Sequence, residues 1–500
     1  MGNICKEEDD IVETYVNNKS VKISELKFPQ RNEYSNFSFE FSVPLIEKSY
    51  SIEFKSKKYG KNYEIDFSRP CNFSKIGGYA KTKRYLSILD GNQILIKPKT
   101  TISWIKEELK TQMRMLKKMD HECKVALPFR IAYMLGYPFL RNKRIWFFMD
   151  LPDIADDNGK HLFKYYMDNG MEPNVDKYFI VSADSKDYDD MKKIGNVIAY
   201  KSIKHRYLGL FVENIITSHP DNGIIYPFWG NYPNLAGLLK SNTIFLQHGI
   251  TKDDVSSWLN KFSMNLSLFV TSARKEYESI FQYPYNYKED VVQLLGFPRF
   301  DNLKNEKDKR QILIMPSWRR YLDDETETSI ADSEFFKRFD SLINNERLIE
   351  TAKSHGYEII FRPHPNVYKY IDLFGKNDYV KIDCNRGSYQ ELFNNGSILI
   401  TDYSSVAFDF AYLYKPVLYY HYSKDYHFDL EDTFYDYETM GFGEICEDED
   451  ALVDLIIEYV ERECEIKDKY SKRIKDFFVY TDRNNCKRVG EAIKKVPLKD

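Results

Sequence analysis

The sequence predicts an α/β protein with two doubly wound domains that face a cleft, preceded by a small β-rich module. Three observations lead there. From residue 144 onward, short apolar runs alternate with amphipathic spans, as in parallel sheets covered by helices. A charged segment at 304–310 divides this alternation in two, and residues 20–100 instead alternate polar and apolar side chains. The predicted domain limits are residues 1–125, 126–300 and 301–500.

The first module is expected to be antiparallel. Period-two patterning occurs at Phe37–Val43, Tyr50–Phe54 and Ile94–Pro98, between turn-forming residues. Residues 103–120 then predict a helix rich in Lys, Met and Leu, which together with residues 130–144 could meet a membrane or an acidic substrate. A solvated helix face is the simpler interpretation of these charges.

The second segment predicts seven strands and a helix at 157–167. The expected strands are 145–149, 178–181, 197–200, 214–217, 243–247, 268–270 and 291–295. The third segment repeats the pattern, with strands at 311–315, 358–361, 380–382, 398–400 and 417–420 and helices at 334–355, 367–374, 388–394, 405–414, 450–463 and 467–480. In open parallel sheets, ligands bind beyond the carboxyl ends of the strands, so we expect a ligand cleft between the two domains.

The bulk composition excludes several classes of protein. The net charge is −4, so no overall positive charge favours nucleic acid. Seven scattered cysteines include no Cys-x-x-Cys pair, which fits a reducing compartment and predicts neither a zinc site nor a disulfide framework. No apolar run reaches the roughly 18–20 residues of a membrane span, and the first residues lack the apolar core of a signal peptide. We therefore expect a cytoplasmic protein.

His248 is the candidate general base. It follows the predicted strand Thr243–Gln247 and precedes Gly249, which places it at the cleft edge of the sheet. The alternative is a histidine that only satisfies a loop carbonyl. We expect a hinge at Gly296, where the last strand of this domain ends. This hinge would direct Arg299 to the cleft.

His364 is the second candidate. It lies between two prolines directly after the predicted strand Glu358–Phe361, and the prolines fix the backbone around the imidazole. Such rigid display of a polar side chain favours function over packing. The neighbouring Arg362 supplies a positive charge suited to phosphate.

Two further clusters follow strands of the same domain. Ser317 and Arg319 flank Trp318 and combine a hydroxyl, an aromatic plate and a guanidinium, although a surface loop with a buried tryptophan is the alternative. Ser404 and Ser405 stand where a helix begins, which favours an anion site or, more simply, a helix N-cap.

These clusters together predict a nucleotide-diphosphate site. The sequence has no Gly-x-Gly-x-x-Gly and no Walker loop, which argues against an NAD enzyme and an ordinary kinase. No Asp-x-Asp or His cluster in the sequence suggests a metal, so no metal or cofactor is expected. Charge on a leaving phosphate would be met by helix N-termini, Ser, Arg and His.

The motifs resemble the CDP-glycerol glycerophosphotransferase family of teichoic acid and capsule polymer enzymes, over about residues 140–490. The matching segments are Gln247–Ile250, Gly296–Arg299, Pro316–Arg319, Arg362–Pro365, Thr401–Ser405, Phe408–Asp409, Asp153–Gly159 and Leu162–Tyr165. Two departures are Ile250, where the family has Thr, and Lys252–Asp254, where it has Pro-Leu-Lys.

The resemblance implies a GT-B-like fold in which the last domain binds CDP-glycerol and the middle domain presents the acceptor. An acceptor hydroxyl would attack the β-phosphorus and release CMP, with His248 as base and His364 and Arg362 at the diphosphate. The other donor-side residues implied are Ser317, Arg319, Thr401, Asp402, Ser404, Ser405 and Asp409. Gly249, Gly296 and Arg299 would line the hinge and cleft, and Asp153 and Asn158 are acceptor-side candidates.

Three other interpretations stay open at this point. The donor could be CDP-ribitol, which the sequence does not separate from CDP-glycerol. A GT-B glycosyltransferase using a nucleotide sugar would need similar phosphate contacts, and a non-catalytic module could hold an anionic polymer in the cleft. The acceptor, expected to be a polymer or a lipid-linked saccharide, and peripheral contact with the inner face of the cell membrane are left undecided by the sequence.

Overall fold

The computed structural model describes most of the chain from residue 93 onward and a set of strands before it. The described ranges are 2–6, 12–17, 19–21, 24–26, 35–40, 50–57, 65–66, 79–82, 84–90, 93–228, 234–235, 237–306, 309–319, 322, 327–375, 377–384, 388–422 and 433–498. Residues 41–43 of one predicted strand, Cys71 and Arg320 lie outside these ranges.

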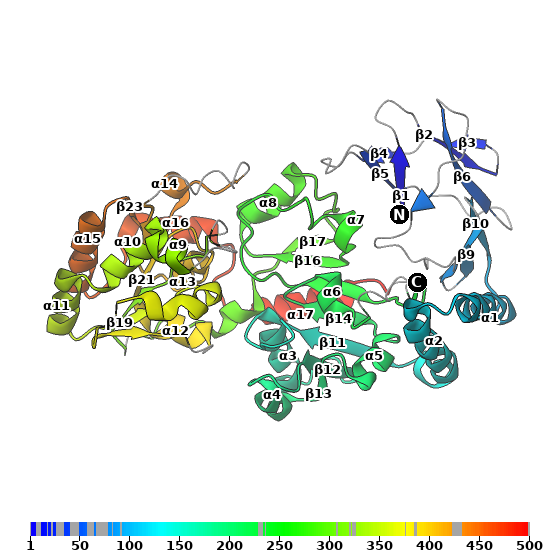
Figure 1. Ribbon diagram of the computed structural model, residues 1–500, viewed down its shortest axis with the longest axis horizontal. Helices are drawn as coiled ribbons and strands as arrows, with labels where there is room; N and C mark the ends of the chain where they lie inside the picture. The colour runs from blue at the N-terminus through cyan, green and yellow to red at the C-terminus, as the bar shows by residue number, and fades with distance from the viewer. Residues whose placement is uncertain are drawn as a thin grey trace.

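Figure 1 shows three parts along the longest axis: the N-terminal strands at one end, a first α/β domain in the middle and a second α/β domain at the other end. The N-terminal part has two antiparallel sheets, of order β4-β5-β1-β7 and β3-β2-β6-β10-β9-β8. Their strands are β1 (Gly2–Lys6), β2 (Val12–Val16), β3 (Lys19–Val21), β4 (Ser24–Leu26), β5 (Ser35–Glu40), β6 (Tyr50–Ser56), β7 (Ile65–Asp66), β8 (Tyr79–Lys81), β9 (Tyr85–Asp90) and β10 (Gln93–Pro98).

Two helices, α1 (Thr101–Lys118) and α2 (His121–Leu140), connect this part to the first α/β domain. α1 agrees closely with the predicted helix at 103–120, whereas α2 was not predicted because it contains Pro128 and Pro138. A buried ion pair between Glu108 of α1 and Arg130 of α2 joins them, and Arg130 also donates to the carbonyl of Asn234. No helix in the described part of the chain is long and apolar enough to cross a membrane.

The first α/β domain is built on a seven-stranded parallel sheet of order β13-β12-β11-β14-β15-β16-β17. Its strands are β11 (Arg144–Met149), β12 (Val175–Val181), β13 (Val197–Ala199), β14 (Asn214–Thr217), β15 (Asn242–Phe245), β16 (Leu268–Thr271) and β17 (Val292–Leu294). Its helices are α3 (Asn158–Asp168), α4 (Tyr188–Ile194), α5 (Ile203–Gly209), α6 (Asn222–Ile225), α7 (Lys261–Met264), α8 (Arg274–Gln282) and the 3-10 helix η2 (Pro298–Asn302). From Ile145 to Met149, β11 is buried at every position, which explains the continuous apolar sequence of this strand.

The second α/β domain has a six-stranded parallel sheet of order β20-β19-β18-β21-β22-β23. Its strands are β18 (Gln311–Ile314), β19 (Glu358–Phe361), β20 (Val380–Ile382), β21 (Gly396–Thr401), β22 (Val417–Tyr420) and β23 (Ile445–Cys446). Its helices are α9 (Glu327–Asp332), α10 (Glu334–Ile343), α11 (Glu346–His355), η4 (Pro365–Leu373), α12 (Tyr389–Asn395), α13 (Val406–Ala411), α14 (Tyr437–Met440), α15 (Glu449–Glu461) and α16 (Asp468–Phe477). The predicted fold class, two doubly wound domains after a β-rich module, is confirmed.

Several predicted helices differ in extent. The helix expected at 334–355 is two helices, because Asn345 caps α11 by accepting from the N–H of Leu348. The helix expected at 367–374 is the 3-10 helix η4, and that expected at 405–414 is shorter.

The last helix, α17 (Asn485–Lys495), was not predicted and packs against α3 and η2 of the first domain rather than on the second sheet. A single apolar core joins the two domains near this crossing, where Phe300 of the first domain lies 4.3 Å from Tyr412 of the second between ring centroids. The C-terminal helix thus packs on the first domain, within the apolar core that the two domains share.

Candidate functional site

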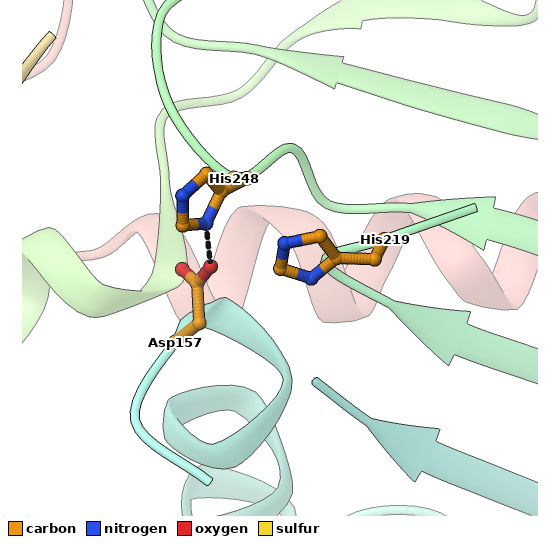
Figure 2. Close-up of side chains that lie close together, drawn as sticks. All are labelled: Asp157, His219 and His248. Carbon is orange, nitrogen blue, oxygen red and sulfur yellow. Dashed lines mark hydrogen bonds and ion pairs between the residues drawn. The ribbon is translucent and has the colours of Figure 1, made fainter. Parts of the chain in front are cut away.

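His248 stands at the carboxyl end of β15 and is exposed, whereas its partner Asp157 is buried at the start of α3. Nδ1 of His248 lies 2.5 Å from Oδ2 of Asp157 (Figure 2). With Nδ1 held by a carboxylate, Nε2 is the ring nitrogen left for a ligand. An imidazole held in this way can act as a general base.

Each member of this pair shifts the pKa of the other. Surrounding protein by itself lowers the pKa of His248, but the charge of Asp157 and the hydrogen bond outweigh this and raise the pKa above its ordinary 6.5. Burial by itself raises the pKa of Asp157, yet the Arg299 guanidinium and His248 hold it well below its usual range. Asp157 is therefore a carboxylate throughout the physiological range.

Arg299 joins the two domains at this point. Its Nη1 donates to Oδ1 of Asp157 at 2.7 Å and to the carbonyl of His248 at 2.6 Å. On its other edge, Nε and Nη2 donate to the two carboxylate oxygens of Asp409 on α13, at 2.6 and 3.0 Å. The guanidinium thus links the His248–Asp157 pair to the second domain.

Gly249 has little room for a side chain, and Gly296 has none. A Cβ built on Gly249 would lie 3.3 Å from Oγ of Ser405, so the two domains approach closely beside His248. Gly296 has φ +80°, and a Cβ there would lie 2.1 Å from Oδ1 of Asn485 on α17. Gly249 thus lies where the two domains meet and Gly296 lies against α17, while the role of both as a hinge stays a prediction.

The backbone before His248 is held in an uncommon conformation. Gln247 has φ +66°, a left-handed value that is rare outside glycine. Asn158 donates to its carbonyl at 2.7 Å, and Glu276 accepts from its side-chain amide at 3.2 Å. Asn158 also accepts from the N–H of Arg299 at 3.0 Å, so its observed contacts fix the site from behind.

Asp150, which directly follows β11, anchors the start of α3. Its carboxylate accepts from the hydroxyl of Ser218 and from the N–H groups of Asp157, Gly159 and Lys160. Burial, with the charge of Asp157 adding to it, raises the pKa of Asp150 to about 7. A side chain on Gly159 would strike the carbonyl of Met149 at 2.5 Å, so glycine is needed for this approach.

Four sequence-predicted donor residues make internal contacts at the ends of β18 and β21. Arg319 and Asp402 form a buried ion pair at 2.9 Å, and Asp402 accepts from the N–H of Ser317 at 2.9 Å. The Ser317 hydroxyl accepts from Arg319 at 2.7 Å, and Thr401 donates its hydroxyl to the carbonyl of Met315 at 2.7 Å. These contacts shape the loops that follow the two strands.

The remaining donor-side candidates are placed differently. Ser405 is exposed at the start of α13, next to Ser404, whose hydroxyl accepts from the N–H of Val406 at 3.4 Å. His364 is exposed after β19 and caps η4. Arg362 is buried, 3.3 Å from Asp383 and with its guanidinium 4.2 Å from the ring centroid of Tyr389.

The segment that departs from the family pattern makes a contact between domains. Ile250 is buried in the core, so the hydroxyl usual at this position is replaced by an apolar contact. The carbonyl of Lys252 accepts from the hydroxyl of Thr433 at 2.9 Å and from the N–H of Phe434 at 3.2 Å. The departure therefore affects the face where the two domains meet.

Sequence reasoning selected Asp153 from the acidic segment before α3 and missed Asp157. Asp153 is exposed, and its carbonyl accepts from the hydroxyl of Ser185. Asp156 of the first domain was also missed. Its carboxylate accepts a hydrogen bond from the hydroxyl of Ser388 in the second domain. His219 was missed as well, although it follows a predicted strand and the rule that selected His248 would have found it.

Asp157, His219 and His248 are the group that could hold a metal ion among the described residues, with one ligand atom of each within 4.8 Å of the others. Two ligands of a tetrahedral zinc lie about 3.3 Å apart, given bonds of about 2 Å. The 2.5 Å contact between His248 and Asp157 is a hydrogen bond instead. The observed geometry is that of a hydrogen-bonded acid–base pair.

Comparison with known proteins shows the family of this chain. Residues 130–495 match the family model described as CDP-glycerol:poly(glycerophosphate) glycerophosphotransferase. The minor teichoic acid biosynthesis protein GgaB of Bacillus subtilis is 41% identical over 480 residues, covering 92% of this chain and 53% of that protein. The teichoic acid glycerol-phosphate transferase of Staphylococcus aureus is 31% identical over 196 residues, 36% of this chain and 48% of that protein.

The chain thus spans about half the length of these curated relatives. Among solved structures, the wall teichoic acid polymerase TagF superposes with a TM-score of 0.58 at 16% identity, covering 79% of this chain and 98% of that one. At this identity the likeness concerns the fold, which is of the GT-B kind.

Proposed function

Because the chain belongs to the CDP-glycerol:poly(glycerophosphate) glycerophosphotransferase family, we propose that it transfers glycerol phosphate from CDP-glycerol to a hydroxyl of a teichoic-acid-like or capsular polymer. The observation that carries the proposal is the pairing of exposed His248 with buried Asp157 beside the start of α13. The proposed base would then stand on one domain and the proposed anion site, at the start of α13, on the other, across the close approach of Gly249 to Ser405.

The transfer would run as an in-line displacement. The acceptor hydroxyl gives its proton to Nε2 of His248 while its oxygen forms a bond to the β-phosphorus of CDP-glycerol. The bond from that phosphorus to the bridging oxygen breaks, and the electron pair stays with CMP. Asp157 holds the ring in the tautomer that leaves Nε2 unprotonated and stabilises the imidazolium that forms.

The donor would lie against the second domain. We assign the diphosphate to exposed His364 and to Ser404 and Ser405 at the start of α13, with Arg362 supplying charge behind them. Arg319, Asp402, Thr401 and Ser317 would act by shaping the loops on which these groups stand. Asp409, which is paired with Arg299, would align the two domains.

CMP release by the purified protein tests the proposal. CDP-glycerol, CDP-ribitol and UDP-sugars would be compared in the presence of a glycerol phosphate oligomer. We expect CMP from CDP-glycerol, lost in His248→Ala and kept in His355→Ala, a control because His355 is exposed at the end of α11. Preference for CDP-ribitol would identify the protein as a ribitol-phosphate transferase. Turnover of a UDP-sugar alone would show that it is a glycosyltransferase and would overturn the proposal.

We also propose that the α1–α2 hairpin contacts a membrane that carries anionic lipid, which would bring the enzyme to a lipid-linked acceptor. Both helices expose large apolar side chains: Ile102, Leu109, Met113, Leu116, Ile131, Leu135 and Phe139. Exposed basic residues stand between them: Lys106, Lys110, Arg114, Lys117 and Lys124. Apolar and basic side chains on one amphipathic helix favour an anionic bilayer surface.

Vesicle co-sedimentation tests this contact. We expect the protein to pellet with phosphatidylglycerol vesicles, and the double variant Leu135→Glu, Phe139→Glu to stay in the supernatant. Ile203→Glu is the matched control, because Ile203 is 79% exposed on α5 outside the hairpin. Equal pelleting of all three proteins would rule out the hairpin as the contact.

A further inference from the structure

A second histidine lies beside the proposed base. His219 follows β14, the strand that pairs with β15, and its ring centroid is 4.7 Å from that of His248. Figure 2 shows its ring pointing from the sheet toward Asp157 and His248. The backbone is fixed by a turn in which the Thr217 hydroxyl donates to the His219 carbonyl and accepts from its N–H. The turn therefore explains the backbone conformation of His219 but not the position of its ring.

The protonation of His219 follows from its surroundings. Burial, with the charge of His248 adding to it, lowers the pKa of His219 to about 4, so its ring is uncharged near neutral pH. Its Nδ1 is buried and has no hydrogen-bond partner within the described part of the chain. A buried N–H without an acceptor is rarer than a buried bare acceptor, so the single ring proton belongs on Nε2. Nε2 is the nitrogen farthest from the backbone and therefore the one at the tip directed to the site.

We propose that His219 is a second catalytic residue, whose Nε2–H donates a hydrogen bond to a nonbridging oxygen of the phosphoryl group in transfer. This inference rests on the proposed function. The attacked phosphorus must lie within bonding reach of an oxygen held by His248, which puts its nonbridging oxygens beside the neighbouring ring. His219 keeps its proton throughout, while the proton of the acceptor hydroxyl goes to His248 and the electron pair leaves with CMP.

A neutral donor suits this place for two reasons. Its hydrogen bond strengthens as negative charge develops on the phosphoryl oxygens in a site partly shielded from water. A charged imidazolium would instead repel protonated His248, and would therefore make His248 a weaker base. Arg299 supplies positive charge to this cluster, but its contacts are made to Asp157, Asp409 and the His248 carbonyl.

The test compares His219→Ala with His219→Gln, whose side-chain amide keeps an N–H near the position of Nε2. With the donor that the wild type uses, we expect kcat of His219→Ala to fall about 10²–10³-fold with little change in KM for the acceptor. We expect His219→Gln to recover at least about tenfold of this loss, and both variants to keep an acid limb in the pH profile, because His248 remains the base.

Three results would overturn the role of His219. The first is a kcat of His219→Ala within threefold of wild type, and the second is an equal loss of kcat in His219→Ala and His219→Gln. The third is a wild type that loses activity after EDTA treatment and regains it with zinc, which would make the cluster a metal site. A wild type that turns over a CDP-alditol while His219→Ala does so equally well refutes this inference alone. A wild type silent with every donor refutes it together with the proposed function.

Discussion

Replacement of Asp157 by Asn is the sharpest perturbation of the base. Oδ1 of Asp157 accepts from Arg299 and from the N–H of Asn158, whereas Oδ2 faces Nδ1 of His248. In the variant, the amide oxygen would stay with the two donors, and the amide NH₂ would face His248. Nδ1 would then become an acceptor and the ring proton would move to Nε2, where the base must be free.

The expected size of this effect is that of lost general-base catalysis. We expect kcat to fall about 10²–10⁴-fold, which corresponds to about 2.7–5.4 kcal/mol of transition-state stabilisation. Asn is as good an N-cap as Asp, so α3 should be kept and the melting temperature should change little. Any remaining activity should extend to lower pH, because the charge that raises the pKa of His248 is gone.

Steady-state CMP release at saturating CDP-glycerol measures this change. Asp168→Asn is the matched control at the other end of α3, where Asp168 is exposed and pairs only weakly with Lys164. A kcat for Asp157→Asn within threefold of wild type, with an unmoved acid limb, would refute the role given to the pair.

The remaining predictions concern pH, a glycine and a buried ion pair. Because the pKa of His248 is raised above 6.5 and the base must be neutral, kcat/KM should fall as the pH drops through a value above 6.5; a flat profile to pH 5 would contradict this. Gly296→Ala should destabilise the protein by about 2–5 kcal/mol, from left-handed strain and overpacking, whereas Gly170→Ala, left-handed but with open space around it, should cost about 1–2 kcal/mol in urea unfolding. Arg319→Met should cost about 3–5 kcal/mol by leaving Asp402 buried and unpaired; a higher KM for the donor at unchanged stability would instead place Arg319 on the ligand.

Much of the fold could be predicted because its signals are local. Strands buried on both faces appear as short apolar runs, and their carboxyl ends carry the polar clusters that converge on the cleft. α2 was missed because Pro128 and Pro138 argue against a helix, and packing of its buried face overrides them. The break between α10 and α11 depends on one capping side chain, Asn345, within an otherwise continuous amphipathic pattern.

The site was predicted at the level of candidate residues and not of their pairing. His248 and Arg299 follow directly from their places after strands, but the contact of His248 with Asp157 joins residues 91 positions apart. Arg319 and Asp402 were likewise selected from the sequence, but their contact with each other was not predicted. Arginine suits a phosphate site and Asp402 was expected to shape the site or contact the glycerol, yet the two side chains meet each other across 83 positions of sequence. Only the tertiary structure shows that pairing.

We propose above that this protein forms a phosphodiester by base-assisted transfer from a CDP-alditol. The most direct measurement is ³¹P NMR of the product made from CDP-glycerol and a glycerol phosphate oligomer. We expect a new phosphodiester resonance equal in amount to the CMP released, absent with His248→Ala and present with His355→Ala. CMP release with free glycerol phosphate as the only product, or a phosphodiester formed equally well by His248→Ala, would contradict it.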